Sequence, residues 1–422
     1  MTRTFRAVFR GLFGGLATVP GLIALALFAV AQIVLWIDRT FDAALRDWWD
    51  GSLVVPYDTA TTVLSTVAAG ALTTLGLVYS LVLVVFTTAA GNIGPRLLPR
   101  FTSDRINQIT AGLFGGLFLF ALAVLFATTP VHVPPLGLFL TVALAVLAVL
   151  QLILFVNAAA RSVQVDAEVA EIARQLEAGM AELLANADWR DADDRVERRS
   201  VGTFRAWSSG YLGRIDVDAL ADLAARHDVF LTLTRGAGDF VLENEPLARA
   251  DRSPDGALDV FQNDLRDAIE LTPSRSPEAD VEYAINLLIE IALRALSPGI
   301  NDTYTAIASV DRLSAALARP LRDGLRGNVR LRNGVPRLLL PSPSLSGLVA
   351  TVFGPLRRAA SGNVLMHEAI LEALDRLHDV AAPDAKGLLR REAALVLEEA
   401  ARADLLAHDM ALLRRRARRL RR

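Results

Sequence analysis

The richest set of polar side chains in the sequence lies between residues 280 and 302. Four of them repeat every four residues and so share one helical face, and three follow in the turn that Pro298 and Gly299 impose: Glu282, Asn286, Glu290 and Arg294, then Ser297, Asn301 and Asp302. One interpretation is a capped helix-turn-helix with a surface ion pair. The other is a polar pocket, in which free N–H groups at the start of the second helix hold an anion or a partner's carboxylate. The sequence leaves both open.

Motifs for catalysis and metal binding are missing from the sequence. The five histidines are scattered, and no His-Glu-x-x-His pattern occurs: His132, His227, His367, His378 and His408. There is no glycine-rich phosphate loop, no Gly-x-Ser-x-Gly elbow and no dinucleotide fingerprint. The chain has no cysteine, which excludes disulfides, cysteine-ligated zinc and thiol catalysis. We therefore expect neither enzyme activity nor a cofactor or resident metal.

Hydroxyl side chains recur every seven residues in one long uncharged stretch: Thr59, Thr66, Thr73, Ser80 and Thr87. On a helix they form a polar face that either packs closely against another helix or lines a water-filled path, although hydroxyls also bond their own backbone four residues earlier. A strict seven-residue repeat drifts by about 20° per heptad on a straight helix. Burial of this face therefore requires supercoiling against a partner helix, in the same chain or in another copy. Gly112 and Gly116 also have the spacing of closely packed membrane helices.

The composition indicates a membrane protein. The 422 residues are 53% hydrophobic, with a mean hydropathy of +0.37, and residues 11–37, 59–95 and 106–160 contain no Asp, Glu, Lys or Arg. About 20 apolar residues span a bilayer as a helix, and helices pair their own backbone groups in lipid. We predict helices at about 11–36, 61–88, 108–128 and 136–157, the last two separated by the proline-rich residues 129–135.

The charges of the loops set the orientation of these helices. The first loop carries Arg39 and Arg46 against five aspartates, whereas the second carries three arginines against the single Asp104: Arg96, Arg100 and Arg105. Positive charge marks the cytoplasmic side, so both termini are predicted to be cytoplasmic in a multi-pass protein. The apolar run that follows the first arginines is too long for a signal peptide, and further spans follow it. The three arginines of the second loop are candidate contacts for lipid headgroups.

Five regions are predicted along the chain. Residues 1–160 form a four-helix transmembrane domain, and residues 161–199 an amphipathic stalk that continues the fourth helix, because 138–178 lacks Gly and Pro and keeps a helical apolar spacing. Residues 200–250 form a small α/β subdomain, with a helix capped by Asp216 and a faint similarity to the lipoyl-carrier hammerhead but no lysine at the turn. Residues 251–413 form a helical cytosolic domain, and residues 414–422 a basic tail.

Two features refine this division. A β-hairpin is predicted near 329–338, because Asn333-Gly334 separates two apolar-rich runs, and Pro336 predicts that its second strand lies at a sheet edge. Seven of the last nine residues are arginine. Those at the start of this tail, Arg414, Arg415 and Arg416, either bind anionic headgroups at about 1 kcal/mol each or remain solvated. No specific nucleic-acid partner is expected.

Two stretches resemble the bacterial family called domain of unknown function 2254. They are residues 80–108, with Gly-Pro-Arg-Leu-Leu at 94–98, and residues 291–302, with Ala-Leu-Ser-Pro-Gly-Ile-Asn-Asp at their end. The resemblance implies four N-terminal spans followed by a cytosolic region, in the bacterial cytoplasmic (inner) membrane. The sequence departs from the family pattern at Thr303, where the pattern has proline, and at residues 87–90, where it is richer in Gln and Ser. The family name supplies no activity.

The fold class expected from these patterns is a mainly α membrane protein with four N-terminal transmembrane helices and a mostly helical cytosolic region that holds a small β-containing subdomain. The first functional hypothesis is a homo-oligomeric conduit for ions or small solutes, with the second helices around an axis and the cytosolic region as gate or sensor. The alternative is a membrane-anchored scaffold or sensor, whose spans only pack and whose surface around residues 290–302 binds a partner or small ligand.

Overall fold

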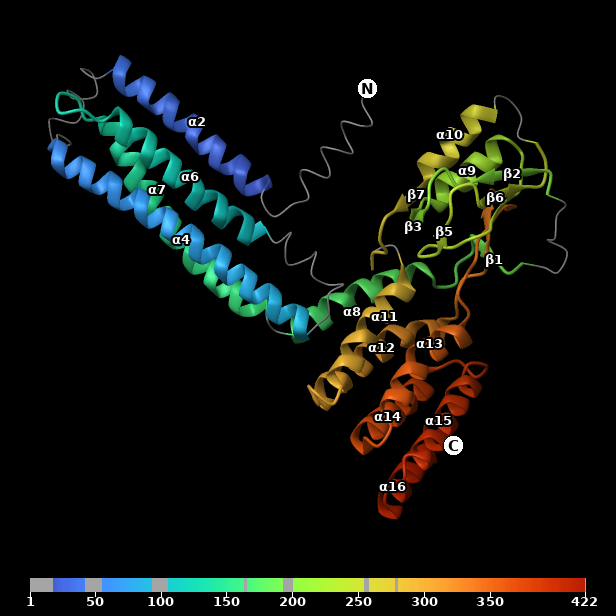
Figure 1. Cartoon of the computed structure of the whole chain (residues 1–422). Coiled ribbons are helices and arrows are strands. Elements are labelled where there is room, and N and C mark those ends of the chain that lie inside the picture. Colours follow the sequence, from blue (N-terminus) through green and yellow to red (C-terminus); the bar gives the residue numbers. More distant parts are fainter. Residues whose placement is uncertain are drawn as a thin grey trace. The chain divides into compact units, whose positions relative to one another are not determined.

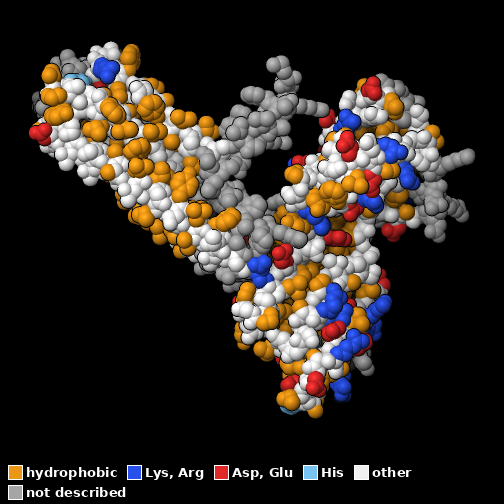
Figure 2. Space-filling model, viewed as in Figure 1, with side chains coloured by type: hydrophobic (Ala, Val, Ile, Leu, Met, Phe, Trp, Pro, Cys, Tyr) orange, Lys and Arg blue, Asp and Glu red, His pale blue; other side chains and the backbone are white. Residues whose placement is uncertain are grey.

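The computed structural model describes residues 18–41, 55–92, 105–162, 165–192, 200–253, 258–277 and 280–421. They belong to two compact units, Met1–Val165 and Asp166–Arg422. The first holds four long apolar helices, and the second is mostly helical with two small sheets (Figure 1). This confirms the predicted mainly α fold. Hydrophobic side chains cover much of the visible face of the first unit, whereas acidic and basic side chains gather on the second (Figure 2).

Four helices of the first unit are long and apolar enough to cross a membrane: α2 (Thr18–Thr40), α4 (Tyr57–Asn92), α6 (Arg105–Ala127) and α7 (Pro135–Ser162). Helix α6 is the most buried of them and contacts the other three. A Cβ built on Gly112 would lie 2.7 Å from the Cβ of Ile23, and one built on Gly116 would lie 2.9 Å from the Cβ of Leu27. The spacing of these glycines thus brings the backbone of α6 against α2.

The described residues of the second unit form two sheets. Their strands are β1 (Trp189–Arg190), β2 (Gly202–Arg205), β3 (Gly210–Ile215), β4 (Leu231–Leu233), β5 (Phe240–Val241), β6 (Pro246–Ala250), β7 (Ile269–Thr272), β8 (Val329–Arg332) and β9 (Val335–Leu339). The larger sheet has the order β1-β8-β9-β4-β6-β2 and the smaller β5-β3-β7. Helices α9 (Val217–Arg226) and α10 (Leu258–Ala268) belong to the same region, and Asp216 caps α9 by accepting from Ala219 N at 3.0 Å. The β structure therefore draws strands from well outside residues 200–250.

The hairpin β8–β9 turns through Asn333 and Gly334, whose φ angles of 53° and 75° suit a type I′ turn. The prediction that Pro336 places β9 at an edge is wrong, because β9 lies between β8 and β4. The pairing with β4 is confined to Leu338 and Leu339, beyond the proline. A missing N–H at Pro336 therefore interrupts no bond to β4.

The predicted stalk corresponds to α8 (Val165–Glu182). Residues 163 and 164, which would join it to α7, lie outside the described residues, so a continuous rod remains a prediction. Beyond α8 the chain enters β1, and residues 193–199 also lie outside the described part.

The rest of the second unit is a helical layer made of α11 (Val281–Ala295), α12 (Thr303–Asp323), α13 (Leu345–Ala359), α14 (Val364–Val380), α15 (Lys386–Arg402) and α16 (Ala407–Ala417), followed by the short helix η3 (Arg419–Arg421). Side chains fix where four of these helices begin, each accepting from a backbone N–H three residues on: Asp280, Asp302, Ser344 and Asn363. Consecutive helices of the layer contact each other along the chain.

Candidate functional site

The hydroxyl face of α4 points away from the other helices of its own unit. Thr59, Thr66, Thr73, Ser80 and Thr87 are all exposed, whereas the opposite face, with Leu64, Ala68, Ala71 and Val78, is buried. A Cβ built on Gly70 or Gly76 would meet nothing within 4 Å. Within the described part of the first unit, no helix covers this face.

Three of these hydroxyls donate to their own helix. Thr66 donates to Thr62 O at 2.7 Å, and Thr73 to Ala69 O and Thr87 to Val84 O, both at 2.9 Å. Such bonds satisfy a hydroxyl in lipid, in a helix interface or beside water. Leu77 and Val84, 65% and 56% exposed, share the outward side of the helix. The small and polar character of the face is therefore strongest between Thr59 and Gly76.

Asp38 is a buried polar residue that sequence patterns did not reveal. Its side chain is wholly inaccessible, and its carboxylate accepts from Leu136 N at 3.1 Å and from Gly137 N at 2.9 Å. These are the first free N–H groups of α7, where a negative charge is favourable. The last turn of α2 thereby caps α7, a contact between residues 98 and 99 positions apart.

Replacing Asp38 by alanine is expected to destabilise the membrane unit by about 1–2 kcal/mol, because α7 loses its cap. Thermal unfolding in detergent would measure the loss. Asp38→Asn keeps a side-chain oxygen and should lose less. Equal stability of Asp38→Ala and the parent would show that the cap contributes nothing.

The turn between α11 and α12 gives its polar residues structural contacts. Ser297 Oγ donates to Arg294 O at 2.6 Å, and Asn301 has a φ of 51°, a left-handed conformation that asparagine tolerates. The Asp302 carboxylate accepts from Thr305 N at 3.1 Å and from the Thr305 hydroxyl at 2.6 Å. The Thr305 hydroxyl and backbone bonds lower the pKa of Asp302 below its ordinary value. These contacts favour the capped helix-turn-helix interpretation.

The other members of this predicted polar site lie along α11. Glu282 is exposed, and Asn286, Glu290 and Arg294 are half-buried. The structure thus keeps them on one helical face, as their spacing predicts.

Substitutions in this turn separate a cap from a binding role. Asp302→Ala should cost about 1 kcal/mol of stability, whereas Asn301→Gly should be nearly neutral, because glycine accepts a positive φ. The Asp302 contribution is present above about pH 4 and is lost as the pH falls through the lowered pKa of the folded state. Thermal unfolding between pH 3 and 7 would measure both effects. An Asp302→Ala protein of unchanged stability would contradict the cap.

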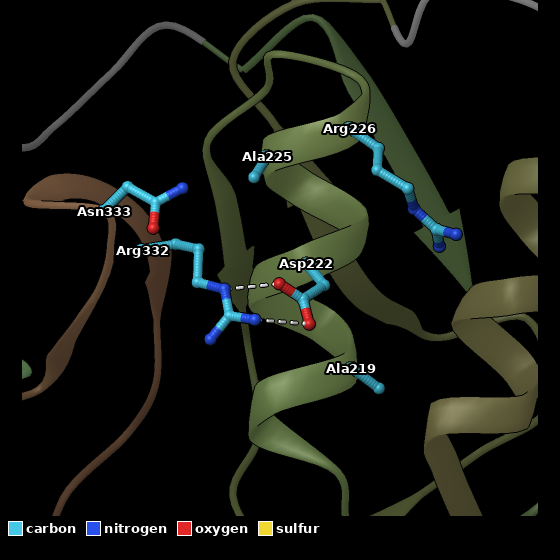
Figure 3. Close-up of a pocket in the computed structure, with 6 residues that line it drawn as sticks. All are labelled: Ala219, Asp222, Ala225, Arg226, Arg332 and Asn333. Atoms are coloured by element: carbon cyan, nitrogen blue, oxygen red, sulfur yellow. Dashed lines mark hydrogen bonds and ion pairs between the residues drawn. The ribbon is translucent and has the colours of Figure 1, made fainter.

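An open groove of about 710 Å³ lies between α9 and the β8–β9 turn, lined by Ala219, Asp222, Ala225, Arg226, Arg332 and Asn333 (Figure 3). The Asp222 carboxylate accepts from Arg332 Nη2 at 2.9 Å and also pairs with its Nε. Arg226 points away from Asp222 and bonds Asp264 at 3.0 Å. Both arginines that line the groove are thus neutralised by carboxylates, which disfavours it as an anion site.

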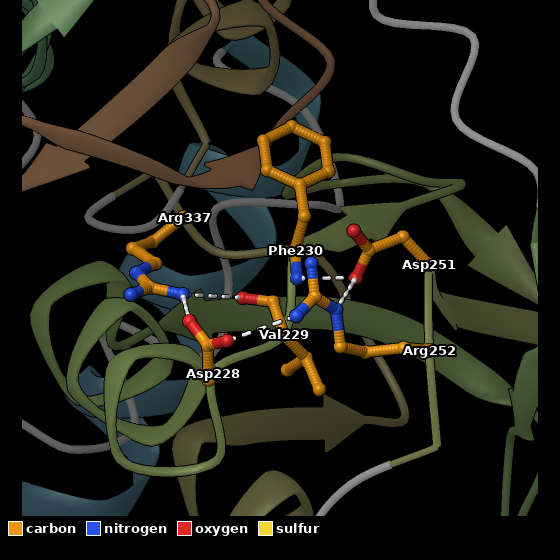
Figure 4. Close-up of polar contacts among 6 residues, drawn as sticks. All are labelled: Asp228, Val229, Phe230, Asp251, Arg252 and Arg337. Atoms are coloured by element: carbon orange, nitrogen blue, oxygen red, sulfur yellow. Dashed lines mark hydrogen bonds and ion pairs between the residues drawn. The ribbon is translucent and has the colours of Figure 1, made fainter.

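A second charged cluster links the turn after α9 to β9 through hydrogen bonds and ion pairs (Figure 4). Asp228, with a φ of 45°, accepts from Arg337 at 2.8 Å and from Arg252 at 2.9 Å. The bond from Arg337 is the main cause that lowers the pKa of Asp228. Asp251 accepts from Phe230 N at 2.7 Å. These contacts join segments up to 109 residues apart. A structural role is therefore sufficient to explain the charged residues of this cluster.

The arginine-rich end is folded as far as Arg421. Leu413 and Leu420 are buried, and Arg416 donates to Glu368 at 3.0 Å, whereas Arg414 and Arg415 are exposed. In the membrane unit, Arg105 begins α6, and the other two arginines predicted to contact headgroups, Arg96 and Arg100, lie outside the described residues. No group of three or more His, Asp or Glu residues in the described part is placed to hold a metal ion.

Comparison with known proteins identifies the family of this chain. A family model described as predicted membrane protein, DUF2254, matches residues 14–376. The chain belongs to this family. Two uncharacterized proteins, from Mycobacterium bovis and Mycobacterium tuberculosis, are each 28% identical over 370 residues, or 83% of this chain and 70% of theirs. No solved structure matches the chain significantly.

Thr303 makes a side-chain contact at the start of α12. Thr303 is the first helical residue of α12, a position where proline is favourable because its N–H needs no partner within the helix. Here the Thr303 hydroxyl instead accepts from Asn363 Nδ2 at 2.9 Å. In this DUF2254 protein, the turn after α11 is thereby tied to the start of α14.

Proposed function

We propose that this membrane protein assembles into a homo-oligomer in which the α4 helices border a path for ions or small solutes. The second unit, joined to the last membrane helix, acts as the gate or sensor. The proposal places the chain in the cytoplasmic membrane with both termini inside, as the loop charges indicate. It assigns no catalytic role to any residue.

The observation that carries this proposal is the outward direction of the hydroxyl face. Thr59, Thr66 and Thr73 are exposed on a long helix whose opposite face is buried against its own bundle. Contact with lipid is less favourable for a hydroxyl face than for an aliphatic one, because the apolar lipid chains cannot hydrogen-bond to the hydroxyl groups. Contact with another copy or with water uses those groups.

A scaffold or sensor is the second candidate, and one observation favours it. The hydroxyls of Thr66, Thr73 and Thr87 already bond their own helix, so the face does not require water. In that case the α4 helices only pack, and the cytosolic unit binds the partner or ligand.

Single cysteines separate the two candidates, because the chain has none of its own. In proteoliposomes, Thr66→Cys and Thr73→Cys should react with a membrane-impermeant thiol reagent if α4 borders an aqueous path. Val149→Cys, on the exposed apolar side of α7 (57% exposed), is the matched control and should not react. The same vesicles should show a solute or ion flux that the reagent reduces.

The particle mass in detergent completes the test. A multiple of the 45.5 kDa chain is expected. A monomer with no flux under any gradient, and with Thr73→Cys as unreactive as Val149→Cys, would contradict the conduit. An oligomer without flux or reactivity would favour the scaffold.

A further inference from the structure

We propose that one end of the helical layer docks on the lipid surface of the membrane. This end, called here the three-turn surface, comprises the turns between α11 and α12, α13 and α14, and α15 and α16, together with the first residues of the helices after the first two turns (296–304, 360–365 and 403–406). The inference does not depend on the conduit, because it concerns a contact made by the second unit with lipid alone.

Hydrogen bonds place the three turns at the same end of the layer. Asn363, before α14, donates to Thr303 at the start of α12. Arg357, near the end of α13, donates to Glu399, near the end of α15, at 3.1 Å. The opposite end is marked by Ala382 N donating to Leu321 O at 2.9 Å, after α14 and near the end of α12. Successive hairpins of the layer thus turn at one common surface (Figure 1).

Large apolar side chains are exposed in or directly after each of the three turns. Ile300 and Tyr304 are 43% and 76% exposed, Leu365 is 52% exposed and Leu406 is 74% exposed. At the opposite end, the turn between α14 and α15 buries Ala381 and Ala385, and Val380 before it is the one large apolar side chain of that turn that is exposed, at 46%. Single exposed apolar residues are ordinary, but a repeat in every turn at one end indicates a contact surface. Tyrosine beside aliphatic side chains is the composition favoured at a membrane–water interface.

The path of the chain selects lipid as the partner. Only residues 163 and 164 separate α7, which is apolar enough to span a membrane, from α8. The second unit is therefore tethered within two residues of a helix that is apolar enough to span the bilayer, so lipid is the surface that it meets at the highest local concentration.

The charges at this end indicate apolar insertion rather than electrostatic attraction. Arg294, Arg358 and Arg402 flank the three turns, as do Asp302, Asp404 and Asp409, and Arg357 is paired with Glu392 and Glu399. A strongly basic patch would bind anionic lipid alone, whereas a near-neutral apolar surface inserts into zwitterionic lipid as well. Because the unit is tethered to the membrane, weak insertion is sufficient for docking.

Fluorescent labels on single cysteines test the docking in the full chain. Tyr304→Cys and Leu406→Cys replace the most exposed members of the three-turn surface, and Val380→Cys, 46% exposed near the opposite end, is the matched control. The labelled proteins are reconstituted in phosphatidylcholine vesicles with or without a lipid that carries a quencher near its headgroup. Interfacial side chains sit roughly 5–10 Å into the headgroup boundary. The labels at 304 and 406 should be quenched several-fold more than the label at 380.

Two outcomes would overturn the inference. Equal quenching at 304, 406 and 380 would show that this end does not meet the bilayer. Unquenched labels at 304 and 406 that transfer energy to labels on other copies, in a manner that depends on protein density, would assign the surface to a second copy. A Leu365→Cys label provides a third reading from the middle turn and should follow the other two.

Discussion

Replacing both Gly112 and Gly116 by alanine is expected to force α6 away from α2 and to give the largest loss of stability in the membrane unit. Each new Cβ would lie within 2.9 Å of a Cβ on α2, that of Ile23 or Leu27. These contacts are close to the α2 backbone, so rotation of a side chain alone cannot relieve them. Overpacking of this kind costs roughly 1–3 kcal/mol at each site.

Unfolding of the full chain in detergent would measure this loss, with α4 supplying the control. Gly70→Ala and Gly76→Ala place a Cβ in open space within the protomer and favour the helix slightly. These variants should leave the protomer as stable as the parent. If Gly76→Ala instead lowers the particle mass at unchanged stability, the α4 face contacts another copy. A Gly112/Gly116 double variant as stable as the Gly70/Gly76 one would contradict the close packing of α2 on α6.

The membrane helices show why a periodic pattern predicts an element but not its partner. Long charge-free stretches were sufficient to predict four helices, and the spacing of Gly112 and Gly116 predicted a close approach. The heptad of hydroxyls on α4 predicts one face equally well. The heptad does not show whether the hydroxyl face packs against a helix of the same chain. In the structure, α6 packs against the opposite face of α4, and the hydroxyl face is exposed.

In the second unit, local sequence patterns predict helix caps and turns, but they do not predict contacts between distant segments. Asp216 and the Asn333-Gly334 turn were predicted because their signals lie within a few residues. The larger sheet instead joins strands from residues 189–250 to the hairpin at 329–339, and Asp38 caps a helix 98 residues away. The polar run that ends at Asp302 is compatible with a capped helix-turn-helix or with a pocket, and the contacts of Ser297 and Asp302 are those of helix ends.

Gly238→Ala is expected to be strongly destabilising in the second unit. Gly238 has a φ of 86°, and its added Cβ would overlap the carboxylate of Asp280 and lie 2.9 Å from Arg275 Nη2. Asp280 is 4% exposed, accepts from Arg275 Nε at 2.5 Å and caps α11 by accepting from Tyr283 N at 3.0 Å. Asp280 is buried but Arg275 is 25% exposed, so separating this ion pair costs less than the roughly 3–5 kcal/mol of a fully buried pair, and loss of the cap adds about 1 kcal/mol.

A second glycine with a positive φ serves as the control for Gly238→Ala. Comparing the two losses of stability separates the steric collision with Asp280 from the strain of a positive φ. Gly334 has a φ of 75° and nothing within 4 Å of a built Cβ, so Gly334→Ala carries only the conformational cost of about 1 kcal/mol. Asp280→Ala removes the same ion pair and cap without a collision and should approach the loss seen for Gly238→Ala. If Gly238→Ala and Gly334→Ala unfold at the same denaturant concentration, the turn at residues 236–239 does not hold the ion pair in place. A loss several-fold larger at Gly238 would make this turn the contact that couples the smaller sheet to the start of α11.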